Sequence, residues 1–231
     1  MFRETSLQDD INHAFERFRR TAGSISPSLA ARETGEVKSV SAGIARVSGL
    51  PGAGYQELLQ FPSDIFGIAM DLKDDETGVV LLGNDALLKA GDEVWRTGRT
   101  LDVPVGDALL GRVINPIGKP LDGKAGIEYS GRLPVERPAP AIMDRAPINK
   151  PLQTGIKVVD AMIPIGRGQR ELILGDRQTG KTAIGIDTIL NQRGKDVICV
   201  YCAIGQRAAT VARSVAQLEA YGAMAYTVVV I

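Results

Sequence analysis

The stretch Gly175-Asp-Arg-Gln-Thr-Gly-Lys-Thr182 constrains the fold of this chain more than any other feature of the sequence. It follows a short apolar run, Leu172–Leu174, and it precedes a helical pattern of apolar residues that extends from Lys181 to about Gln192. Glycines let the backbone turn tightly and bring N–H groups against an anion, and a helix that starts there adds unpaired donors. The spacing G-x-x-x-x-G-K-[ST] between a strand and a helix predicts a phosphate-binding loop.

Each residue type in this loop has a chemical reason. The Lys181 ammonium is expected to reach the β- and γ-phosphates of a nucleotide, and the Thr182 hydroxyl to bind Mg²⁺. The carboxylate of Asp176 is expected to point away from the phosphates, because like charges repel. A nucleotide phosphate chain with Mg²⁺ is thus the expected ligand, and the alternative is a glycine-rich turn with a chance match. The predicted binding residues are Gly175, Asp176, Arg177, Gln178, Thr179, Gly180, Lys181 and Thr182.

The pattern of residues 98–231 is that of an α/β domain. A strand is predicted over residues 197–204, a helix over 210–221 capped by Gly222, and a third strand over 226–231. Successive βα units imply a parallel sheet, and ligands gather at the carboxyl ends of its strands. Gln206 follows one such end and is the last predicted binding residue; the alternative is a hydrogen-bonded loop residue. An amide cannot accept a proton from water, so we expect nucleotide binding with little hydrolysis and assign no catalytic residue.

The two segments that precede residue 98 have patterns of apolar residues unlike that of the α/β domain. Residues 26–97 contain short apolar clusters separated by turns, which predict a small antiparallel β-barrel or sandwich with a structural role. Residues 1–25 carry one apolar stripe at helical spacing, so we expect a short amphipathic helix that folds back on its own domain or docks on a partner.

Composition excludes several classes of protein. Lys plus Arg and Asp plus Glu both total 27, which argues against a nucleic-acid partner. The apolar runs are too short to span a bilayer, and the start is unlike a secretory signal. Two cysteines are too few for a disulfide framework, which suits a reducing cytosol. Cys199 and Cys202 are predicted to face opposite sides of a strand and to be small buried residues.

Several segments together make this sequence similar to one family. They are Gly43–Val47, Val103–Gly106, Leu110–Val113, Asp122-Gly123, Pro151–Lys157, Pro164–Arg170, the loop itself and Gly222–Val229. In these segments the chain resembles the alpha subunits of rotary ATP synthases. The resemblance implies a β-barrel followed by a RecA-like nucleotide domain, with ATP and Mg²⁺ held at a non-catalytic site. Gln206 then matches the position of the water-activating glutamate in the catalytic sister subunit.

The resemblance also implies partners and a location. Beta subunits would alternate with alpha subunits in a hexamer around gamma, and the amino-terminal helix would contact delta. The complex makes ATP from ADP and phosphate with a proton or sodium gradient. It lies on the cytoplasmic face of the bacterial inner membrane, which this subunit would contact only through the complex.

One feature suggests that the sequence is a piece of a longer one. It stops in the apolar strand predicted over 226–231, so we expect an amino-terminal fragment with an incomplete parallel sheet. Two other readings are a Rho-type hexameric RNA-translocating ATPase, which also joins a small barrel to a RecA-like domain, and a folding remnant without function.

Overall fold

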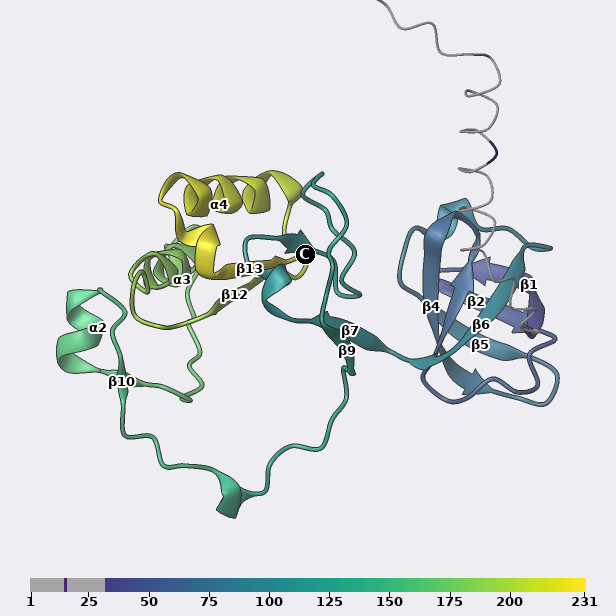
Figure 1. Ribbon diagram of the computed structural model, residues 1–231, viewed down its shortest axis with the longest axis horizontal. Coiled ribbons are helices and arrows are strands. Elements are labelled where there is room, and N and C mark those ends of the chain that lie inside the picture. Colours follow the sequence, from purple (N-terminus) through teal and green to yellow (C-terminus); the bar gives the residue numbers. More distant parts are fainter. Residues whose placement is uncertain (1–14, 16–31) are drawn as a thin grey trace, which may run out of the picture. The chain divides into compact units, whose positions relative to one another are not determined.

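The computed structural model describes residue 15 and residues 32–231 (Figure 1). Apart from Phe15, the amino-terminal helix predicted over 1–25 lies outside the described residues. The chain divides into two compact units, one holding residues up to 55 together with 59–97, the other residues 56–58 together with 98–231.

The first unit contains a closed antiparallel barrel of six strands in the order β1-β2-β5-β4-β3-β6. The prediction of a barrel or sandwich is therefore resolved in favour of a barrel, because β1 pairs with both β2 and β6. The strands are β1 (Thr34–Ser41), β2 (Ile44–Ser48), β3 (Glu57–Phe61), β4 (Ile65–Leu72), β5 (Thr77–Leu81) and β6 (Glu93–Thr100). Two 3₁₀ helices, η1 (Pro62–Asp64) and η2 (Asp85–Leu87), lie in the connections.

Alternation of side chains fills the barrel. In β2, Ala45 and Val47 point inward and are fully buried, while Ile44 and Arg46 are exposed. The turn before β2 is a two-residue hairpin in which Ala42 and Gly43 both have positive φ, the backbone twist that such tight hairpins need. The barrel core thus depends on period-two patterning together with local turn geometry.

The second unit is built on a parallel sheet of three strands. The order is β12 (Cys199–Cys202), β13 (Thr227–Val230) and β8 (Val113–Ile114). The helices α3 (Lys181–Leu190) and α4 (Ala208–Ala220) pack against this sheet (Figure 1). Their contact forms a core around Val113, Ile186, Leu218, Ala223 and Val229. The predicted parallel sheet and both predicted helices are confirmed, with ends that differ by at most two residues.

The remaining elements of this unit are short. They are β7 (Asp102–Val105), η3 (Asp107–Leu109), β9 (Gly131–Pro134), η4 (Ile142–Asp144), β10 (Pro151–Leu152), α2 (Lys157–Met162), β11 (Ile165–Gly166) and η5 (Ala223–Tyr226). Strand β7 pairs with β9 and strand β10 with β11, both antiparallel. Figure 1 draws the segment between β9 and β10 as a long loop that contains η4.

The prediction of a strand over Leu172–Leu174 is wrong. These residues form no strand, and their side chains are 77%, 44% and 80% exposed. A strand needs a neighbour to pair its N–H and C=O groups, and within the described residues no strand pairs with this segment. The apolar run therefore leads into the glycine loop as an irregular, solvent-exposed segment.

A partly buried ion pair anchors β8, a strand that the sequence patterns did not predict. Arg112 Nε donates to Asp122 Oδ2 at 2.6 Å and Arg112 Nη2 to Asp122 Oδ1 at 3.0 Å. The two side chains are only 13% and 7% exposed. The hydrogen bond from Arg112, with smaller contributions from the N–H groups of Lys124 and Val113, holds the pKa of Asp122 well below its usual range. The pair ties the segment after β8 to the edge of the sheet.

Candidate nucleotide-binding site

The glycine loop opens directly into α3. Gly180 lies immediately before Lys181 with φ of 93°, a left-handed conformation in which a side chain would be strained. The first α-helical hydrogen bond runs from Ile184 N to Gly180 O at 3.1 Å. Consequently the N–H groups of the first turn have no acceptor within the helix and are available to an anion.

The Lys181 side chain folds back over this loop. Its Nζ donates to the carbonyl oxygen of Gly175 at 2.8 Å and also to that of Asp176, and it lies 3.4 Å from Thr179 Oγ1. The Thr179 hydroxyl in turn donates to Asp176 O at 2.9 Å. These contacts place a cation at the centre of the turn, next to the amino end of α3.

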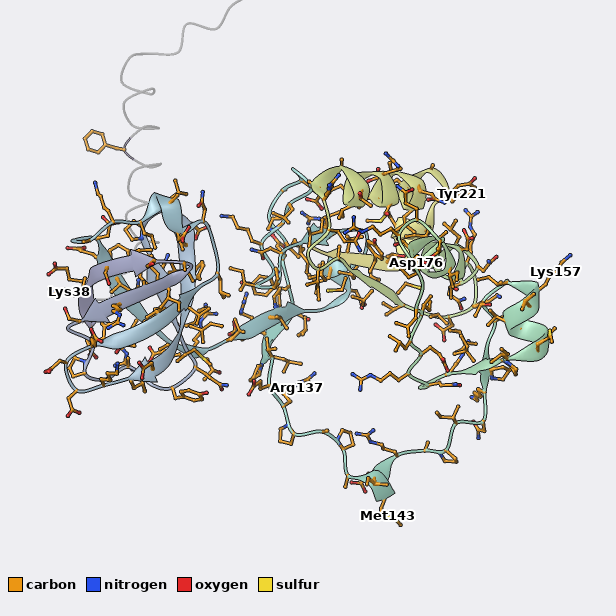
Figure 2. The ribbon with its side chains drawn as sticks, turned by 180° about the vertical axis from the view of Figure 1, so that it is seen from behind. Lys38, Arg137, Met143, Lys157, Asp176 and Tyr221 are labelled. Atoms are coloured by element: carbon orange, nitrogen blue, oxygen red, sulfur yellow. The ribbon has the colours of Figure 1, made fainter. Side chains whose placement is uncertain are left out.

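Close packing in the loop explains why its first residue, Gly175, has no side chain. A Cβ on Gly175 would lie 2.7 Å from Thr179 Oγ1, so a larger residue would displace the threonine that closes the turn. Asp176 (Figure 2) contributes its carbonyl oxygen to the contacts with Lys181 and Thr179. Asp176, Arg177 and Gln178 are exposed, and Gln178 has a φ of 63°.

Thr182 is the predicted Mg²⁺ ligand. It occupies the second position of α3 and is exposed, so its hydroxyl is accessible at the amino end of the helix. Within residues 15 and 32–231, no three His, Cys, Asp or Glu side chains gather as a metal site. A hydroxyl oxygen suits Mg²⁺, which takes its other ligands from phosphates and water.

Gln206 lies in the loop between β12 and α4. The loop contains Gly205 with φ of 65°, and Gln206 itself is exposed. The Tyr201 hydroxyl donates to Gln206 Oε1 at 3.4 Å. Tyr201 belongs to β12, so the side chain of Gln206 is linked to the carboxyl-terminal part of that strand, as the reasoning about parallel sheets expects.

A hydrogen-bonded junction at the far end of α3 escaped the sequence analysis. Asn191 Nδ2 donates to Thr154 O at 3.0 Å, and Gln192 Nε2 donates to Gln153 O at 2.8 Å. Asp160 accepts hydrogen bonds from the Thr154 hydroxyl at 2.7 Å and from the N–H groups of Thr154 and Gly155. These hydrogen bonds lower the pKa of Asp160, and the bond from the Thr154 hydroxyl has the largest effect. Hydrophobic periodicity carries no signal for such a polar junction.

The two cysteines are free and differ in exposure. Cys199 is buried, and burial raises the pKa of its thiol, whereas Cys202 is exposed. The prediction of a buried side chain is confirmed for Cys199 and wrong for Cys202. Strand alternation places Cys202 on the face of β12 that α3 and α4 do not cover.

Over the described part of the chain, no helix is both long and apolar enough to cross a membrane.

Comparisons with known proteins identify both units. Residues 31–98 match the beta-barrel domain of the ATP synthase alpha/beta family, and residues 155–231 match the nucleotide-binding domain of the same family.

Individual relatives show the same similarity. The chain is 65% identical over 217 residues to "ATP synthase subunit alpha 1" of Marinomonas sp. (strain MWYL1), covering 94% of this chain and 42% of that protein. It is 62% identical over 225 residues to "ATP synthase subunit alpha 1" of Shewanella frigidimarina, covering 97% of this chain and 44% of that protein. The chain therefore spans less than half the length of these curated relatives. The matches favour the ATP synthase reading of the sequence over the RNA-translocating one.

Proposed function

Because the chain belongs to the ATP synthase alpha/beta family and is similar to its alpha subunits, we propose that it binds ATP with Mg²⁺ at Gly175–Thr182 without catalysing hydrolysis. The observation that carries this proposal is the position of the Lys181 ammonium. It lies within the glycine turn, bonded to Gly175 O and Asp176 O, beside the unpaired N–H groups of α3. A flexible ammonium and a set of oriented N–H donors are the groups that bind a phosphate chain.

Gln206 supports the non-catalytic part of the proposal. Water attack on the γ-phosphate is accelerated by a residue that orients the water or takes its proton, and an amide does only the first. With Gln206 after β12, ATP is expected to remain bound and intact for many turnovers of a catalytic neighbour. The site would then have a regulatory or structural role.

The proposed setting is a rotary ATP synthase driven by protons or sodium ions. In it, this chain would alternate with beta subunits in a hexamer around gamma, and residues 1–25 would contact delta. Residues 26–97 would form the barrel domain and residues 98–231 the nucleotide domain. The complex would place the chain at the cytoplasmic face of the bacterial inner membrane, which the chain would contact only through the complex.

The test is a fluorescence titration of the full chain with a methylanthraniloyl derivative of ATP in Mg²⁺ buffer. Lys181→Ala should weaken binding at least tenfold, because it removes the cation that contacts the phosphates. Lys157→Ala is the matched control, since Lys157 is an exposed lysine of the same unit at the start of α2 (Figure 2). Equal affinity in the parent chain and Lys181→Ala, or rapid multi-turnover hydrolysis, would contradict the proposal.

A further inference from the structure

We propose that Tyr201 is a positioning residue, which fixes the side-chain amide of Gln206 so that its NH₂ group, rather than its oxygen, faces the terminal phosphate of bound ATP. This inference rests on the proposed function, because it assumes that a nucleotide occupies the loop. It adds a residue and an orientation that the loop motif does not contain.

The ring of Tyr201 is held by the core of the second unit. Tyr201 pairs in register with Val229, which is fully buried, and it packs against the cluster that includes Ile186 and Leu218. Cys199, two residues earlier on the same face of β12, is also buried. The hydroxyl therefore projects from a fixed ring rather than from a mobile side chain.

Gln206, five residues after Tyr201, lies close to this hydroxyl. Gly205 adopts a left-handed conformation with φ of 65°, and the amide of Gln206 then lies within reach of Tyr201. The hydroxyl donates to Gln206 Oε1 at 3.4 Å. With the oxygen engaged by Tyr201, the two N–H donors of this exposed amide remain available to another acceptor.

This orientation has a chemical consequence. An NH₂ group donates hydrogen bonds to phosphate oxygens, and it cannot accept a proton from an attacking water. An amide turned the other way would present a carbonyl oxygen, which repels the γ-phosphate. Tyr201 thus favours tight retention of a triphosphate, and the preference for ATP over ADP depends on its hydroxyl.

Tyr226 provides a matched control. It packs against the same core cluster as Tyr201, but its hydroxyl donates to Ile189 O at 3.1 Å and Leu190 O at 3.3 Å. Removing either hydroxyl leaves an aromatic ring in the same core. Only Tyr201→Phe releases the amide of Gln206, so a general effect on packing can be told apart from the positioning role.

The experiment compares ATP and ADP affinities of the full chain in Mg²⁺ buffer for the parent, Tyr201→Phe, Tyr226→Phe and Gln206→Ala. Tyr201→Phe should lower the preference for ATP over ADP about threefold to tenfold, the effect of one hydrogen bond. Gln206→Ala, a change at an exposed loop position, should cause the same loss. The variant that combines Tyr201→Phe with Gln206→Ala should lose no more of the ATP preference than either single variant. Tyr226→Phe should keep the preference of the parent chain.

The NMR signals of the side-chain NH₂ of Gln206 give a second measurement that needs no nucleotide. These signals are assigned because they disappear from the spectrum of Gln206→Ala. Their chemical shifts should change in Tyr201→Phe but not in Tyr226→Phe. If the parent binds ATP and Tyr201→Phe keeps its preference, the inference is overturned and the proposed function stands. If the parent binds neither nucleotide, both are overturned.

Discussion

Replacing Asp122 by Asn should loosen the edge of the parallel sheet at β8. The carboxylate accepts two hydrogen bonds from Arg112, at 2.6 and 3.0 Å, and others from Val113 N at 3.3 Å and Lys124 N at 3.1 Å. An amide has one acceptor oxygen and no charge. It leaves the guanidinium, which is 13% exposed, facing a neutral group.

The magnitude follows from these contacts. Hydrogen bonds to a charged group contribute about 1.5–3 kcal/mol, and Asn retains part of the geometry, so we expect a loss of about 2 kcal/mol from Asp122→Asn. With a urea m-value of about 2 kcal/mol/M, the unfolding midpoint of the second unit should fall by about 1 M.

Two optical signals separate the units in one urea titration. Circular dichroism at 222 nm follows α3 and α4, whereas Trp95, the sole tryptophan of the sequence, lies on β6 of the barrel. Asp122→Asn should shift the first signal only. Asp144→Asn, an exposed aspartate on η4, is the control and should shift neither. An unchanged midpoint at 222 nm for Asp122→Asn would refute the role given to the ion pair.

The same pair predicts a dependence on pH. The pKa of Asp122 is lower in the folded protein than its unfolded value near 3.9, so its contribution is fully present above that value. The contribution is lost as the pH falls through the folded pKa. The stability difference between the parent and Asp122→Asn should therefore shrink progressively below about pH 4. A constant difference down to strongly acidic pH would contradict this assignment.

Two further perturbations test the packing of each unit. Gly67→Ala places a Cβ 2.6 Å from Val79 Cγ1 inside the barrel, so it should destabilise that unit by about 1–3 kcal/mol, read from Trp95 fluorescence during urea unfolding. Iodoacetamide at neutral pH should modify the exposed Cys202 and spare Cys199, whose thiol is buried with a raised pKa. Mass spectrometry of the native protein checks this, and equal modification of both cysteines would contradict their assigned environments.

The parts of the fold that could be predicted are those encoded locally. Helix α3 follows from the glycines and Lys181 at its start, and β13 from a continuous apolar run after Gly222. Periodicity does not say whether an apolar run finds a partner. Leu172–Leu174 reads as a buried strand, but it forms none and is exposed.

Other features were beyond the reach of patterns because they depend on distant residues. Strand β8 has two residues, Val113 and Ile114, too few to show a period, and pairing with β13 defines it. The pair Arg112–Asp122 spans ten residues of an irregular loop. The contact between Tyr201 and Gln206 likewise needs the reversal at Gly205, which a glycine alone does not locate.

Closure of the barrel has a consequence for self-association. All six of its strands are paired on both sides, so the described part of the first unit offers no strand edge to which another chain could add. Within the described residues, β12 borders the parallel sheet and pairs only with β13, and its residues Val200 and Cys202 face solvent. At rising protein concentration, intermolecular β-pairing should therefore spare the barrel and use open edges such as β12, where a charged residue at Val200 would oppose it.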